Sequence, residues 1–97
     1  MTGVLGSLGD LVEDVVVWLD EPLAIGTDAA GSIIRTRGGS AANVASAAAR
    51  LGRVGVRYLG CIGSAPAGDG LVAGLRDASV DVRVQRHGRT GTILVLV

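Results

Sequence analysis

The residues best placed to do chemistry lie where a glycine pair opens into an alanine-rich segment, at Gly38, Gly39 and Asn43. Glycines leave the backbone open to a ligand, and a helix that begins here directs free N–H groups and a partial positive charge toward it. The Asn43 amide both donates and accepts hydrogen bonds. This combination suits an anion or a polar ligand rich in hydroxyls. A glycine pair before a helix is also a common tight connection, so the local pattern leaves both interpretations open.

The segment that follows the glycine pair predicts a helix, because alanine is the strongest helix former and dominates residues 41–49. Ser40 is the expected N-cap, and Gly52 stands where a left-handed helix stop belongs. The i, i+3, i+4, i+7 spacing predicts one apolar stripe. Its members are Val44, Ala47, Ala48 and Leu51.

A second chemical feature is the acidic cluster Asp10, Glu13 and Asp14, which precedes the β-branched run 15–17. The run favours a strand, so the carboxylates gather near a strand end. Such a cluster is most often a solvated strand end. Its functional interpretation is a carboxylate that accepts hydrogen bonds from the hydroxyls of a sugar-like ligand.

The remaining elements position these residues in an alternating α/β order. Residues 54–62 and 80–85 read as strands, and residues 67–77 read as a helix with Leu71, Val72, Leu75 and Ala78 facing inward. Strand, helix and strand in succession predict right-handed parallel crossovers. Residues 92–97 are continuously apolar, which predicts a strand buried on both faces. The chain stops inside that strand, so we expect it to be the first part of a larger domain.

Composition narrows the function classes. The chain has 97 residues, which predicts one domain, and a formal net charge of zero, which favours neither nucleic acid nor a membrane surface as partner. All nine basic residues are arginine, so lysine-dependent phosphate loops and Schiff-base chemistry are excluded. One cysteine and one histidine cannot make a Cys/His zinc site, and we predict no metal site. No basic N-terminal region precedes the apolar residues, so we expect a cytoplasmic protein.

Four pieces of the chain together resemble the N-terminal segment of the ribokinase-like (PfkB) carbohydrate kinases. They are LGDLVED at residues 8–14, GGSAANVA at 38–45, GCIGSAPAG at 60–68 and TGT at 90–92. Each piece is weakly specific, whereas their order and spacing together are specific. Ser64 and Ala65 depart from the pattern, because the family usually has acidic residues in that turn.

The resemblance implies an incomplete Rossmann-like three-layer α/β domain over residues 1–97, with a small β lid from about 20–37 inserted between the first core strand and the first helix. It implies that Asp14, Gly38, Gly39 and Asn43 bind the sugar. Asp10, Trp18 and Thr90 are possible substrate or lid contacts. The family's catalytic Asp and its site for ATP and Mg²⁺ lie downstream of this segment, so no residue here is expected to be the catalytic base.

Other singled-out residues have simpler interpretations. Cys61 is expected to be a buried, inert thiol, Trp18 to be packed, and Arg86, His87 and Arg89 to form a solvated turn. Three functions stay open at this stage. The first is the sugar-binding portion of a carbohydrate kinase that is inactive alone; the second is a non-catalytic sugar- or nucleoside-binding module that dimerises through lid strands; the third is a non-functional gene fragment.

Overall fold

Two separate three-stranded sheets and two helices make up the fold in this computed structural model, which describes residues 3–97. In chain order the elements are β1 (Val4–Leu8), β2 (Val12–Leu19), β3 (Gly31–Gly38), α1 (Ser40–Leu51), β4 (Gly55–Ile62), α2 (Pro66–Asp77), β5 (Asp81–Arg86) and β6 (Thr92–Leu96). The first sheet has the order β1-β4-β5 and the second has the order β3-β2-β6. The fold is therefore mixed α/β, as the sequence predicts.

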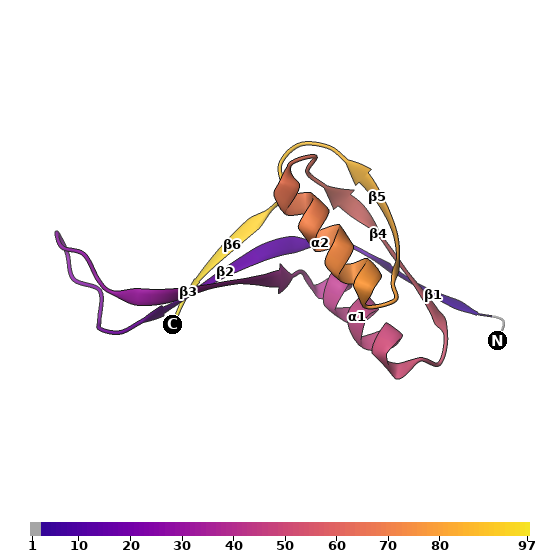
Figure 1. Ribbon diagram of the computed structural model, residues 1–97, viewed down its shortest axis with the longest axis horizontal. Helices are drawn as coiled ribbons and strands as arrows, with labels where there is room; N and C mark the ends of the chain where they lie inside the picture. The colour runs from indigo at the N-terminus through magenta and orange to yellow at the C-terminus, as the bar shows by residue number, and fades with distance from the viewer. Residues whose placement is uncertain (1–2) are drawn as a thin grey trace.

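The first sheet is entirely parallel and carries the core. β1 pairs with β4 and β4 pairs with β5, and the connections run through α1 and α2, respectively. Alternate residues of β4, namely Val56, Tyr58 and Ile62, are buried in one cluster with residues of both helices. Because this cluster joins both helices to the same strand face, α1 and α2 cover one side of the sheet (Figure 1).

Helix α1 packs through its smallest side chains rather than through the predicted stripe. Ala42, Ala45 and Ser46 are buried, whereas Val44 is 53% exposed and Leu51 is 76% exposed. The expected stripe is therefore wrong. Alanine and serine allow the helix axis to approach the sheet closely. The face with the small side chains is therefore buried, and the face with the larger side chains points away from the sheet.

The predicted C-terminal end of α1 is confirmed, and the predicted N-cap is wrong. Gly52 adopts the left-handed conformation at the C-cap, with φ 68°, as predicted. Ser40 is not the N-cap: Gly39 holds that position and no side chain caps the helix. The Asp10 carbonyl instead accepts a hydrogen bond from the Ala42 N–H at 3.4 Å, so backbone from the β1–β2 corner replaces the missing cap.

Two burial expectations are also wrong. All five residues of β6 are exposed, because β6 is an edge strand of the second sheet and neither helix packs on it. Cys61 is exposed because it lies on the face of β4 opposite the helices. Leu59, two residues earlier on the same strand, is likewise exposed. In both cases the covering element is missing from the described residues, although the sequence pattern is that of a buried strand.

The second sheet projects away from the helices (Figure 1). β2 pairs antiparallel with β3 and parallel with β6. Within the interval 20–37, residues 20–30 form a loop without strand structure, and most of β3 follows. β2, which carries Asp14, and β3 therefore form one hairpin, and the end of β3 leads directly into α1.

Candidate functional site

Asp14 and Gly38 lie against each other at the base of the β2–β3 hairpin. Val12 pairs with Gly38 and Asp14 pairs with Thr36 across the antiparallel ladder. A Cβ built on Gly38 would overlap the Asp14 carboxylate, coming within 2.5 Å of both Cγ and Oδ2. The absent side chain at Gly38 is therefore what allows the carboxylate to rest on the backbone beside α1.

The Asp14 carboxylate is incompletely satisfied. Its Oδ1 is buried and has no hydrogen-bond partner among residues 3–97. A buried carboxylate oxygen without a donor is costly, since native proteins pair nearly all such atoms. A hydroxyl group would supply the missing donor without adding charge. A phosphate group would not, because its negative charge would be repelled.

Gly39 fixes the turn into α1. Its φ of 100° is a conformation that side chains disfavour, and a Cβ there would overlap the Asp10 carbonyl oxygen. The Gly39 carbonyl accepts from the Asn43 N–H at 2.9 Å. Asn43 therefore lies in the first turn of α1, and its side chain is exposed. Asp10 contacts the start of α1 through its backbone carbonyl, which accepts from the Ala42 N–H.

The β1–β2 corner that leads to Asp14 is held by Tyr58, a residue that the sequence analysis gave no role. Its hydroxyl donates to the Gly9 carbonyl, and the ring is fully buried on β4. Burial, with the negative charge of Asp10 as a smaller cause, raises the pKa of Tyr58 above its usual 10.0. Tyr58 stays protonated at neutral pH and keeps its donor on the corner.

Trp18 is not packed as predicted, and Thr90 lies beside the turn between β4 and α2. Trp18 is 51% exposed, so the packed position is wrong; it follows Asp14 by four residues on β2 and therefore shares its face, about 13 Å along the strand. Thr90 packs against the β4–α2 turn, where a Cβ on Gly63 or Gly68 would crowd it. Its Oγ1 is buried without a partner among the described residues.

The predicted solvated turn at residues 86–89 contains a structural clamp. Arg86 Nε donates to the Gly63 carbonyl at 2.9 Å, and its terminal nitrogen pairs with Asp69 at 2.6 Å. This arginine ties the end of β5 to the glycine turn and to the first turn of α2. Arg86, His87 and Arg89 are all exposed as predicted, and the two bonds of Arg86 are an additional structural role.

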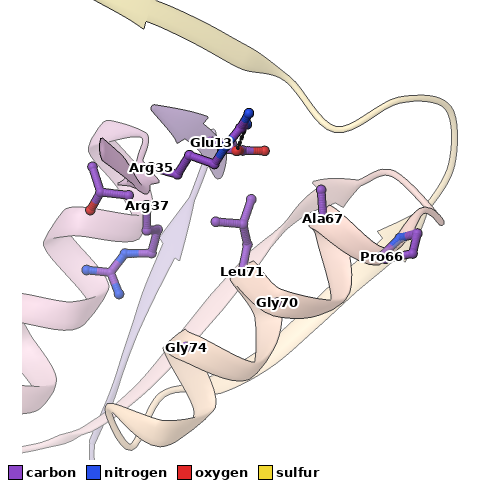
Figure 2. Close-up of a pocket in the computed structure, with 9 residues that line it drawn as sticks. Glu13, Arg35, Arg37, Pro66, Ala67, Gly70, Leu71 and Gly74 are labelled. Atoms are coloured by element: carbon purple, nitrogen blue, oxygen red, sulfur yellow. Dashed lines mark hydrogen bonds and ion pairs between the residues drawn. The ribbon is translucent and has the colours of Figure 1, made fainter. Parts of the chain in front are cut away.

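A distinct cleft opens between the hairpin and α2, on the side that carries Glu13 and Arg35 (Figure 2). A second cleft, with a volume of about 650 Å³, lies on the uncovered face of the first sheet around Leu59 and Cys61. Neither cleft is lined by Asp14, Gly38, Gly39 or Asn43. Of the four predicted sugar ligands, the structure brings Asp14 and Gly38 into contact and places Gly39 and Asn43 in the turn that follows.

Within residues 3–97, no group of three or more His, Cys, Asp and Glu side chains is arranged to hold a metal ion. Over the same residues, neither helix is long and apolar enough to cross a membrane.

The family profile described as pfkB family carbohydrate kinase matches residues 7–97. No curated protein sequence gives a significant match. A carbohydrate kinase from Agrobacterium tumefaciens superimposes with a TM-score of 0.85 and 25% identity, over 100% of this chain and 32% of that one. A fructokinase from Xylella fastidiosa with bound ATP gives a TM-score of 0.78 and 29% identity, over 100% of this chain and 30% of that one.

An aminoimidazole riboside kinase from Salmonella enterica, complexed with aminoimidazole riboside and an ATP analog, is a further structural match. It gives a TM-score of 0.72 and 27% identity, over 96% of this chain and 29% of that one. The chain thus spans about a third of the length of these solved structures.

Proposed function

Because the chain belongs to the pfkB family of carbohydrate kinases, we propose that it is the sugar-binding portion of an enzyme that transfers the γ-phosphate of ATP to a sugar hydroxyl. One observation carries the sugar site: Asp14 Oδ1 is buried beside Gly38 and lacks a hydrogen-bond donor. A polyol hydroxyl is the neutral donor that this oxygen needs. A sugar or a nucleoside ribose both supply such a group.

Each residue of the site has a separate task. Asp14 accepts hydrogen bonds from substrate hydroxyls, and the charge on the carboxylate makes those bonds strong. Gly38 and Gly39 keep the backbone bare where α1 begins, so the substrate approaches the free N–H groups there. Asn43, one turn into α1, supplies an amide that both donates and accepts. Trp18 and Thr90 are proposed as outer contacts, and Asp10 acts through its carbonyl.

The same proposal assigns the phosphoryl-transfer machinery to other parts of the kinase. Phosphoryl transfer needs a nucleotide with its metal ion, a base for the attacking hydroxyl and positioned donors, all together. Asp14 does not suit a triphosphate because both are negatively charged. Since the chain covers about a third of the kinases it matches, we propose that ATP and Mg²⁺ bind outside it and that it is inactive alone. The single cysteine fits the proposed cytoplasmic location.

A second candidate function is a non-catalytic module that binds a sugar or nucleoside and dimerises through the second sheet. The exposed apolar residues of β3 and β6 favour it, because single soluble chains rarely leave so much apolar surface in one place. They include Ile33, Ile34, Leu94 and Leu96. Both candidates share the Asp14 site, and they differ in whether phosphate is ever transferred.

The first test measures sugar binding by calorimetry over a panel of ribose, fructose and nucleosides. Asp14→Asn keeps the shape of the side chain but removes its charge, so we expect at least about tenfold weaker binding of whichever sugar binds. Asp28→Asn, a matched change in the exposed 20–30 loop, should leave affinity unchanged. Sugar binding that Asp14→Asn leaves intact would place the site elsewhere.

The second test asks whether the chain transfers phosphate. We expect no sugar phosphate from the isolated chain with ATP and Mg²⁺ under conditions in which a sugar binds. Turnover by the isolated chain would contradict the assignment of the catalytic base to another part of the enzyme.

A further inference from the structure

The cleft between the hairpin and α2 is a feature that the proposed function does not use. It has a volume of about 370 Å³, within the range of small-molecule sites. Glu13, Arg35 and Arg37 line one wall, and Ala67, Gly70, Leu71 and Gly74 of α2 line the other. Figure 2 shows Leu71 and Ala67 projecting from α2 toward the strand wall.

Two glycines of α2 keep the cleft open. Gly70 and Gly74 are four residues apart and therefore lie on one face of the helix. A Cβ built on either would meet no heavy atom within 4 Å, so each faces empty space. The α2 wall is consequently apolar and recessed, with Leu71 as its largest side chain. Such a wall fits the carbon skeleton of a ligand rather than an ion alone.

The strand wall of the cleft has an excess of positive charge. Arg35 pairs with Glu13 at 2.7 Å, which neutralises that arginine (Figure 2). Arg37 makes no ion pair with any described carboxylate, and its Nε is buried without a hydrogen-bond partner in residues 3–97. A guanidinium that is partly desolvated and lacks a counter-charge is destabilising, and an anion beside it would offset that cost.

We propose that this cleft is a second ligand site, which binds a small organic anion: a carboxylate or phosphoryl headgroup on an apolar body. Arg37 holds the headgroup, because its counter-charge is missing, whereas Arg35 is already occupied by Glu13. The apolar body lies over Leu71 and in the space left by Gly70. The site is separate from the Asp14 site because Glu13 and Asp14 are consecutive on β2 and their side chains point to opposite faces of the sheet.

The test uses phenyl phosphate and benzoate as probes, with phenol as the neutral analogue and inorganic phosphate as the headgroup alone. Amide NMR shifts of the full 97-residue chain report where each probe binds. We expect both aromatic anions to shift Arg37, Leu71 and Gly74 at millimolar concentration, and phenol to bind about tenfold more weakly or worse. The stronger of the two aromatic anions identifies the preferred headgroup, and phosphate alone should be weaker than phenyl phosphate.

Variants separate the proposed site from general charge attraction. Arg37→Gln should weaken phenyl phosphate binding by about tenfold or more, whereas Arg83→Gln on the opposite sheet should have no effect. Gly70→Leu fills the cleft and strengthens the helix, so it should abolish binding in a chain that stays folded. Binding that survives both Arg37→Gln and Gly70→Leu, or no shift at these residues with either anion, would overturn the proposal.

Discussion

At Gly38 the absence of a single methyl group decides the geometry of the candidate sugar site. The Asp14 carboxylate occupies the space that a Cβ would fill. The resemblance to the family pointed to Asp14 and to both glycines from the sequence. The unpaired Oδ1, the Arg37 Nε and the Tyr58–Gly9 hydrogen bond were not predictable, because each depends on strand register and on contacts between residues distant in the chain.

Gly38→Ala should expel the Asp14 carboxylate from its position. The new methyl group and the Asp14 carboxylate cannot occupy the same space, so either the backbone or the carboxylate must shift. We therefore expect a destabilisation of about 1–3 kcal/mol, together with loss of sugar binding. Urea unfolding measures the first effect and calorimetry the second. Gly55→Ala is the control, since the new Cβ there would meet only the Val4 side chain at an ordinary 3.7 Å. Equal effects from both substitutions would contradict this account.

Tyr58 predicts a loss of stability at alkaline pH. The pKa of Tyr58 is raised in the folded chain, so above about pH 10 the unfolded chain releases this proton first. Stability is then full below pH 10 and falls as pH rises toward the folded pKa, by at most about 1.4 kcal/mol per pH unit.

This alkaline effect is measurable directly, because Tyr58 is the only tyrosine. Absorbance at about 295 nm follows phenolate formation, and urea unfolding at several pH values follows stability. Tyr58→Phe should abolish the pH dependence of stability in that range. It should also lower stability by the same amount at every pH below about 10, because the hydrogen bond to Gly9 is lost. A Tyr58 that titrates at its ordinary pKa in the folded chain would contradict the prediction.

At the scale of elements, type and order were predictable and the choice of buried face was not. The periodicity of α2 correctly predicted the burial of Val72 and Leu75. The pattern predicted the wrong face of α1, because Val44 and Leu51 face away from the sheet while Ala42 and Ala45 face it. Hydrophobicity ranks valine above alanine, whereas close helix–sheet packing selects the smaller residue.

Helix α2 begins without a side-chain cap, which gives a stabilising prediction. Ala65 is the N-cap residue, with φ −74° and ψ 164°, and makes no side-chain hydrogen bond. That conformation suits aspartate, whose carboxylate would accept from the Ala67 or Gly68 N–H groups. Ala65→Asp should raise stability by about 1 kcal/mol in urea unfolding. Ser64→Asp, with the same charge one residue earlier, should gain much less; an equal gain would mean that the charge alone is responsible.

The whole molecule is elongated. Its radius of gyration is 16.1 Å, against about 13 Å expected for a compact chain of this length. The difference arises because the second sheet extends beyond the two helices, so many apolar side chains of β3 and β6 stay exposed (Figure 1). From sequence, these strands resemble buried ones. Residue patterns report how much apolar surface a strand offers, but not which element covers it.

Self-association is the expected consequence at this scale. Sedimentation velocity should show a concentration-dependent shift to larger species. Ile34→Lys places a charge on the 54% exposed position of β3 and should reduce association. Leu51→Lys, at an even more exposed position on α1, should have little effect. If Leu51→Lys reduces association as much as Ile34→Lys does, association does not depend on the second sheet.

The alternation of Glu13 and Asp14 on β2 also bears on which length changes the chain tolerates. Inserting one residue directly before Glu13 would move each following side chain of β2 to the other face of the sheet. The carboxylate of Asp14 would then face α2, and that of Glu13 would face Gly38. Insertions in the 20–30 loop leave that parity untouched. Descendants of this sequence should therefore vary in length at the hairpin tip and keep a constant count of residues between Gly9 and Asp14.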